Sequence, residues 1–260
     1  MSWQPKSVFL TTSWDDGHPH DLRIAELLAK YGQRGTFYVP FRSQRPVLEV
    51  SAIKRIGASF DLGGHTMDHI DLTSLADSSA RHQLTECKQR LEDLTGRSCL
   101  MFCPPCGRLK RSQQRLVRQA GYTGIRTVEL MSTSYGSMRN GLAILPTTIQ
   151  AFQHTSPAYL RNVARRLAFR SLPNLARAYR YGISWSATAA RLLELALSQG
   201  GVFHLWGHSW EIDEANAWNE LESILRLMAV CGRTATAISN AALCAVLRQD
   251  WRGPYETQTN

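Results

Sequence analysis

Two adjacent aspartates and a closely spaced pair of histidines are the residues of this chain whose types and spacing could do chemistry. Asp15 and Asp16 stand in the stretch TTSWDDGHPHD, directly after an apolar run that predicts a strand over Val8–Ser13. Neighbouring carboxylates repel each other, so a bound cation would offset the cost of placing both at a strand end. His65 and His69 in GGHTMDH are spaced i, i+4, which on one helical turn would put both imidazoles on the same side.

Two imidazoles and one carboxylate make a site for a divalent metal with open positions for water and substrate. One aspartate would bind the metal, and the other would act as a general base beside the bound water. Zinc suits these donors best, and iron, cobalt or nickel would also fit. We expect Gly63 and Gly64 to let the chain turn before the two histidines. Histidines also gather at the other predicted strand ends, namely His18, His20, His204 and His208.

Apolar strands alternate with amphipathic helices along nearly the whole chain. Predicted strands include residues 35–40, 99–102, 122–128 and 202–206, and a helix follows most of them. Repeated βα units call for a parallel sheet, and seven or eight of them favour a closed or nearly closed barrel. We expect one α/β domain over residues 1–249 with a basic helical insertion near 155–182, and a polar tail at 250–260.

The formal charge of +9 is concentrated in one segment. Residues 155–195 hold seven arginines against one acid, Glu194, with aromatic residues between them. We expect this segment to bind an anionic group of the substrate or a lipid surface, rather than nucleic acid. No apolar run is long enough to span a membrane. The N-terminus lacks a signal-peptide pattern, so we expect a cytoplasmic protein, with peripheral attachment at the inner membrane surface as an alternative.

Four motifs in this chain resemble those of the polysaccharide deacetylases, the NodB homology domain of carbohydrate esterase family 4. SWDDGHPHD is similar to the family's T-F-D-D-G signature, GGHTMDHIDLTSL to its H-[ST]-x-x-H motif, FCPPCG to R-P-P-Y-G, and VFHLWGHSWE to its late histidine motif. The resemblance spans roughly residues 8–212. It implies a distorted (β/α) barrel with about seven parallel strands, and a metal-dependent carbohydrate N-deacetylase.

The resemblance also implies a role for each matching residue. Asp16, His65 and His69 would bind the metal, commonly zinc. Asp15 would be the base that activates water, and His208 the acid that protonates the leaving amine. The position whose backbone N–H serves the oxyanion in the family is occupied by Cys106 in this chain.

This sequence departs from the family at two positions of the third motif. Cys103 stands where the family has the arginine that contacts the catalytic aspartate, and Cys106 stands where it has tyrosine. Either another cation orients Asp15, for which His18 is the nearest candidate in the sequence, or no cation does. Trp206 and Trp210 are candidates for walling a sugar pocket, because aromatic faces stack on pyranose rings; core packing explains them equally well.

Three other functions compete with this interpretation. Cys99, Cys103 and Cys106 have the spacing C-x₃-C-x₂-C, which resembles the cluster motif of radical SAM enzymes. A sugar-binding barrel that has lost turnover would account for the missing arginine. An amidase acting on a non-sugar amide, such as a ring ureide, is a further alternative. The favoured substrate is an N-acetylated sugar in a polysaccharide, oligosaccharide or glycolipid precursor, with a phosphate or lipid link as one form of it.

Overall fold

The computed structural model describes residues 7–154, 161–162, 164 and 184–250. Most of the predicted basic insertion near 155–182, and the tail after residue 250, lie outside these residues. No helix among the described residues is long and apolar enough to cross a membrane.

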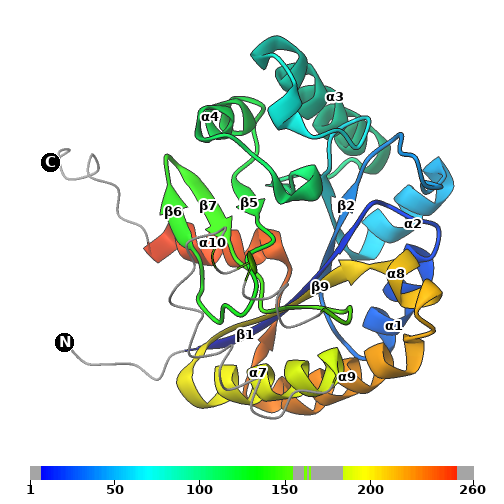
Figure 1. Ribbon diagram of the computed structural model, residues 1–260, viewed down its shortest axis with the longest axis vertical. Coiled ribbons are helices and arrows are strands. Elements are labelled where there is room, and N and C mark those ends of the chain that lie inside the picture. The colour runs from blue at the N-terminus through cyan, green and yellow to red at the C-terminus, as the bar shows by residue number, and fades with distance from the viewer. Residues whose placement is uncertain (1–6, 155–160, 163, 165–183, 251–260) are drawn as a thin grey trace, which may run out of the picture.

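The described strands form one curled sheet in the order β6-β7-β5-β4-β3-β2-β1-β9-β8, and β10 pairs with β1 (Figure 1). All pairings are parallel except β6 with β7, which is antiparallel. The expected distorted (β/α) barrel is therefore confirmed. The strands are β1 (Val8–Asp15), β2 (Gly35–Val39), β3 (Asp61–Gly64), β4 (Met101–Phe102), β5 (Gly124–Arg126), β6 (Ser137–Arg139), β7 (Leu142–Leu145), β8 (Ile149–Gln150), β9 (Gly201–His208) and β10 (Thr236–Ala237).

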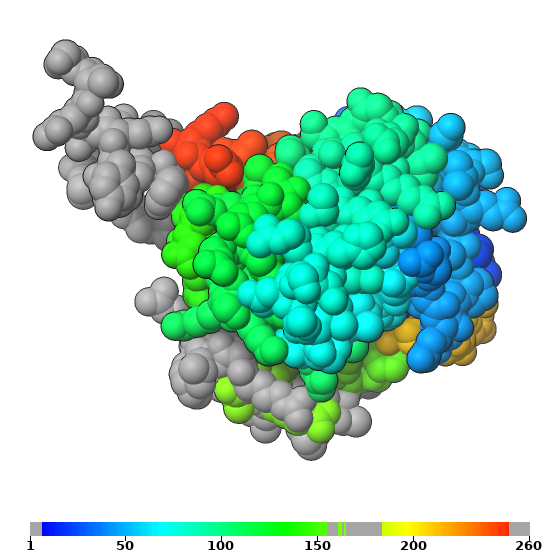
Figure 2. Space-filling model, turned by 90° about the horizontal axis from the view of Figure 1, so that it is seen from above, coloured from blue at the N-terminus to red at the C-terminus, as the bar shows by residue number. Residues whose placement is uncertain are grey.

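Amphipathic helices surround the sheet and cover its outer face (Figure 1). Helix α3 buries Ala80, Leu84, Cys87 and Leu91 along one side, as their helical spacing predicts. In the space-filling view α3 makes up the centre of one face, with α10 at its edge (Figure 2). The helices are α1 (Asp21–Lys30), α2 (Val50–Ser59), α3 (Asp77–Thr95), α4 (Arg111–Gln119), α7 (Trp185–Gln199), α8 (Ser209–Glu214), α9 (Trp218–Val230) and α10 (Asn240–Asp250).

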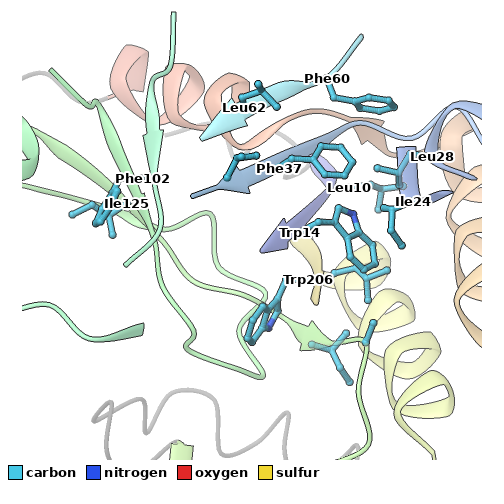
Figure 3. Close-up of a cluster of buried hydrophobic side chains, with 14 of the residues drawn as sticks. Leu10, Trp14, Ile24, Leu28, Phe37, Phe60, Leu62, Phe102, Ile125 and Trp206 are labelled. Carbon is cyan, nitrogen blue, oxygen red and sulfur yellow. The ribbon is translucent and has the colours of Figure 1, made fainter. Parts of the chain in front are cut away.

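Strand β1 has one face on the larger hydrophobic core and the other on the barrel interior, which holds a smaller hydrophobic cluster with Tyr38 and Leu243. Trp14 lies beside Ile24 and Leu28 of α1, and Figure 3 shows the Trp206 side chain pointing away from them. Side chains alternate between the two faces of a strand. Asp15 therefore points to the opposite face from Trp14, into the barrel, where it is 3% exposed.

The sheet register brings the ends of distant strands together. Asp15 is paired directly with His208 between β1 and β9, although the two residues are far apart in the sequence. Gly63 and Gly64 lie inside β3 and do not turn the chain, contrary to the sequence prediction. They are needed for close packing instead, because a Cβ on Gly63 would collide with the Tyr38 ring and one on Gly64 with Tyr122.

Candidate active site

A cavity of about 520 Å³ lies at the carboxyl ends of the strands. In parallel βα sheets this end of the strands is where ligands bind. The site residues predicted from the sequence all line this cavity, with the exception of His18. They are Asp15, Asp16, His65, His69, Cys106, Trp206, His208 and Trp210.

Several non-glycine residues that line the cavity, or that adjoin a lining residue, have left-handed backbone conformations. The φ angle is 77° at Asp16, 61° at Thr66, 49° at His69 and 55° at Cys106. Such conformations are uncommon for side-chain-bearing residues, and they gather at functional sites where the surrounding structure holds them. They also correct one prediction. His65 and His69 do not share a helical turn but lie in an irregular loop after β3, and their rings still meet at a centroid distance of 5.0 Å.

Asp16, His65 and His69 bring three potential ligand atoms within 4.8 Å of one another. The Nε2 atoms of His65 and His69 lie 3.4 and 3.0 Å from Asp16 Oδ1. This oxygen is buried but accepts no well-directed hydrogen bond from the described residues. Burial alone would raise the pKa of Asp16, but the two histidines beside it lower this pKa below its ordinary value. The carboxylate is therefore ionised.

The tautomer of His65 supports a cation between these three groups. Its Nδ1 lies 2.7 Å from the carbonyl oxygen of Cys103, and a carbonyl can only accept, so Nδ1 carries the proton. In the neutral ring Nε2 then presents a lone pair toward Asp16 Oδ1. The other carboxylate oxygen, Oδ2, accepts a hydrogen bond of 2.9 Å from the indole of Trp210. The donor set, with one free carboxylate oxygen and imidazole nitrogens facing it, fits a divalent metal.

Asp15 forms a buried ion pair with a residue that the motif comparison did not identify. Arg126, the last residue of β5, donates from Nη2 to Asp15 Oδ1, and its side chain is fully buried. Burial alone would raise the pKa of Asp15, but the Arg126 guanidinium, with His65 and His208, holds this pKa below its usual value. Cys103 Sγ lies 3.7 Å from the second oxygen, Asp15 Oδ2.

His18 is not the cation beside Asp15, so that prediction is wrong. Its Nδ1 accepts a hydrogen bond of 3.3 Å from the backbone N–H of His20, and its ring lies 4.8 Å from the His20 ring. The left-handed turn at Asp16 and Gly17 separates His18 from the end of β1.

The three cysteines do not gather into one metal-binding group within the described part of the chain. Cys99 and Cys103 are buried, and burial raises the pKa of both thiols, so they lack the thiolate that a cluster needs. Cys106 is exposed at the cavity. A second group of nearby ligand atoms consists of Asp15, His65 and Cys103. It is less suited to a metal, because Arg126 occupies Asp15 and the thiol is protonated.

A chain of hydrogen bonds holds the late histidine, which lies beside Asp15 at the end of β9. His208 Nδ1 lies 2.6 Å from Glu211 Oε2, and its Nε2 lies 3.9 Å from Asp16 Oδ2. Gln150 donates to the same Glu211 oxygen and in turn contacts His154. Burial alone would lower the pKa of His208, but the hydrogen bond to Glu211 and the charges of Asp16 and Asp15 outweigh it and raise the pKa to about 9.

The sequence holds signals for two of the site residues that motif comparison missed. Arg126 is a charged residue within the predicted strand YTGIRTV, and a strand covered on both faces seldom carries an unpaired charge. Glu211 follows His208 by three residues, and α8 begins at once after His208 and brings the two side chains together. Gln150 and His154 carry no comparable signal.

The curled parallel sheet and the polar cavity at its strand ends define the class of protein. The sequence profile of the family described as polysaccharide deacetylase matches residues 3–125, which contain Asp15, Asp16, His65, His69 and Cys106. The resemblance to this family that the motifs indicate is therefore confirmed. A comparison with curated proteins found no match.

Solved structures share the fold over nearly the whole chain. A candidate polysaccharide deacetylase from Mycobacterium smegmatis is 14% identical, with a TM-score of 0.67 over 100% of this chain and 97% of that one. The chitin deacetylase of Colletotrichum lindemuthianum is 14% identical, with a TM-score of 0.58 over 94% and 90% of the two chains. A carbohydrate esterase family 4 pseudoenzyme from Bacillus anthracis is also 14% identical, with a TM-score of 0.53 over 93% and 66%.

Proposed function

We propose that this protein is a metal-dependent hydrolase that removes an N-acetyl group from an acetamido sugar in a polysaccharide, oligosaccharide or glycolipid precursor. The observation that carries the proposal is a single cavity lined by a carboxylate with two histidines, a second ionised carboxylate and a histidine whose pKa is raised. Amide hydrolysis needs an activated water, a stabilised oxyanion and a proton for the leaving amine. The family match supports the same reaction class.

Asp16, through Oδ1, and His65 and His69, through Nε2, would hold the metal. A divalent cation bound there would supply Lewis acidity, which makes a bound water more acidic. We propose zinc first, with iron, cobalt or nickel as alternatives, because all four accept imidazole and carboxylate ligands. Trp210 keeps Asp16 Oδ2 occupied and so favours coordination through Oδ1 alone.

The remaining groups divide the proton transfers between them. Asp15 accepts the proton of the attacking water through Oδ2, because Oδ1 is engaged by Arg126. The backbone N–H of Cys106, in the left-handed turn after β4, stabilises the oxyanion. His208 donates the proton on Nε2 to the leaving nitrogen, while Glu211 binds its Nδ1. Trp206 and Trp210 offer aromatic faces to the sugar ring.

Acetate release from N-acetylated sugars tests the proposal directly. We expect the purified protein with added Zn²⁺ to release acetate from N-acetylglucosamine oligomers or from an acetylated glycolipid precursor. Sugar binding without acetate release would instead support a barrel that binds and does not turn over. Hydrolysis of a ring ureide with no action on any acetamido sugar would support the non-sugar amidase.

The pH profile depends on Glu211. A general acid must be protonated, so activity is lost as the pH rises through the pKa of His208, which the hydrogen bond to Glu211 raises. Glu211→Gln removes the negative charge that raises this pKa. We therefore expect the alkaline limb of the kcat profile to move to lower pH in this variant. Glu220→Gln, an exposed substitution on α9, is the control and should leave the limb in place. An unchanged alkaline limb in Glu211→Gln would contradict the role given to His208.

An anionic substituent on the substrate would explain an arginine at the rim of the cavity. Arg161 lines the cavity, is exposed, and has no carboxylate partner among the described residues. The adjacent Asn162 holds this part of the chain in place, since it accepts a hydrogen bond from Leu130 N and donates one to Val128 O. Arg165 and Arg166, which belong to the basic segment predicted to bind an anionic group, lie outside the described residues. A lipid-phosphate link would also bring the protein to the inner membrane surface.

Arg161→Gln tests this part of the proposal. We expect the KM for a phosphorylated acetamido sugar to rise about tenfold, because one charge-assisted contact contributes about 1.5–3 kcal/mol. The KM for a neutral analogue should stay within twofold. Arg191→Gln removes an arginine on α7 that pairs with Glu194 and serves as the control. An equal rise of KM for the charged and the neutral substrate would exclude anion recognition by Arg161.

A further inference from the structure

We propose that Arg126 is the positioning residue for the Asp15 carboxylate. Strand β5 then supplies the cation that polysaccharide deacetylases carry in their third motif, at the position that Cys103 occupies in this chain. The inference rests on the proposed function, because it assigns a residue for that reaction. It is carried by the sheet register, the burial of Arg126 and the shape of its surroundings.

The register places the two candidate positions side by side. β4 and β5 are parallel neighbours, with Phe102 paired to Ile125. Cys103 follows β4 directly and Arg126 is the last residue of β5, so the two positions come next in this register, at the carboxyl ends of adjacent strands. A long side chain from either position can reach the same point. An arginine at the end of either β4 or β5 can therefore contact the carboxylate at the end of β1.

The surroundings of Arg126 direct it toward Asp15. Its guanidinium carbon lies 5.1 Å from the centre of the Tyr38 ring and 4.7 Å from that of Trp206, so aromatic faces confine it. The Tyr38 hydroxyl donates to Asn240 and does not compete for Asp15. Asp15 is the carboxylate that compensates the buried charge, and a buried cation without a partner would be strongly unfavourable.

This contact fixes which carboxylate oxygen is available for chemistry. Arg126 Nη2 engages Oδ1 of Asp15, whereas the hydrogen-bond donor to Oδ2 among the described residues is the weak S–H group of Cys103 at 3.7 Å. Oδ2 is therefore the oxygen that can accept a proton. Cys103 is almost fully buried, and its small side chain leaves room for the arginine from β5.

Moving the arginine back tests the inference. Arg126→Met should lower kcat by about 10²-fold, the loss expected when a reacting group is misplaced, with KM within threefold and metal content unchanged. The double variant Arg126→Met with Cys103→Arg should have a kcat at least tenfold higher than that of Arg126→Met alone. Arg126→Lys keeps the charge but loses the planar set of guanidinium donors, so its kcat should lie between those of the wild type and Arg126→Met. This variant replaces Arg126→Met in the test if the methionine variant does not fold. Arg55→Met, which breaks a solvent-exposed pair with Glu26, is the control.

Two outcomes overturn the inference: full kcat in Arg126→Met, or no recovery when arginine is placed at position 103 in a folded double variant. If the wild type releases no acetate and the proposed function itself fails, the Tm measured by thermal unfolding still tests whether Arg126 serves Asp15. Arg126→Met should then lower Tm by about 10 °C in the wild-type background, and by much less in an Asp15→Asn background. Cys103→Arg should recover part of the loss. Equal losses in both backgrounds would show that Arg126 does not serve Asp15.

Discussion

Replacing Asp15 by asparagine is expected to reduce acetate release by about 10³-fold while the protein keeps its metal. Asparagine has nearly the same shape, but its amide cannot accept a proton from water, and a positioned general base contributes about 10²–10⁴-fold. Asp16, His65 and His69 remain in place, so the metal content should equal that of the wild type. Acetate release and elemental analysis of the same preparation give both values.

The variant also leaves Arg126 buried without its anionic partner. Breaking a buried pair on one side costs about 3–5 kcal/mol of stability, so a lower Tm is expected together with the loss of activity. Activity should therefore be measured well below the Tm of the variant. Asp93→Asn, on the exposed side of α3, is the matched control and should change neither quantity. A variant at Asp15 that stays within tenfold of wild-type turnover would rule out its role as the base.

The placement of Asp15 was predictable because it depends on local periodicity. The apolar run before it predicts a strand, and alternation along β1 puts Trp14 in the core and Asp15 in the barrel. Parallel strands then gather their carboxyl ends on one side of the sheet. The same reasoning correctly brought His208 to this place, and the register confirms that it lies directly opposite Asp15.

The conformation of the histidine loop and the partner of Asp15 could not be obtained in this way. The spacing of His65 and His69 fits a helical turn, but left-handed φ angles at Thr66 and His69 bring the rings together in an irregular loop. Such angles depend on tertiary contacts rather than on spacing. Arg126 was missed because its partner is 111 positions away in the sequence. Only the sheet order shows that β5 can reach β1.

The fold alone does not decide whether this chain is active. A carbohydrate esterase family 4 pseudoenzyme from Bacillus anthracis shares the fold, and so does a mutant of it described as having restored enzymatic activity. Activity must therefore be argued from the site. The missing motif arginine was the strongest reason to suspect impaired turnover, and the Arg126 contact with Asp15 removes that reason.

Removal of the metal is the second change with a large expected effect. We expect the purified wild type to hold about one divalent ion per chain and to lose both the ion and its activity on chelation. Without a cation, the buried Asp16 Oδ1 has the Nε2 atoms of His65 and His69 beside it, at 3.4 and 3.0 Å, but accepts no well-directed hydrogen bond from the described residues. A ligand at 100 times its Kd stabilises the folded state by about 2.7 kcal/mol, so chelation should lower Tm by about 5–10 °C.

His65→Ala should reproduce the effect of chelation on metal content and Tm, and the chelator should then have no further effect on that variant. The expected loss is large because His65 is 2% exposed and the Cys103 carbonyl fixes its Nδ1, which holds Nε2 beside Asp16. His82→Ala removes an exposed histidine of α3 that pairs with Glu86, and it should bind metal as the wild type does. Equal metal content in wild type and His65→Ala would place the ion elsewhere and remove the basis for assigning Asp16 and His69 as its ligands.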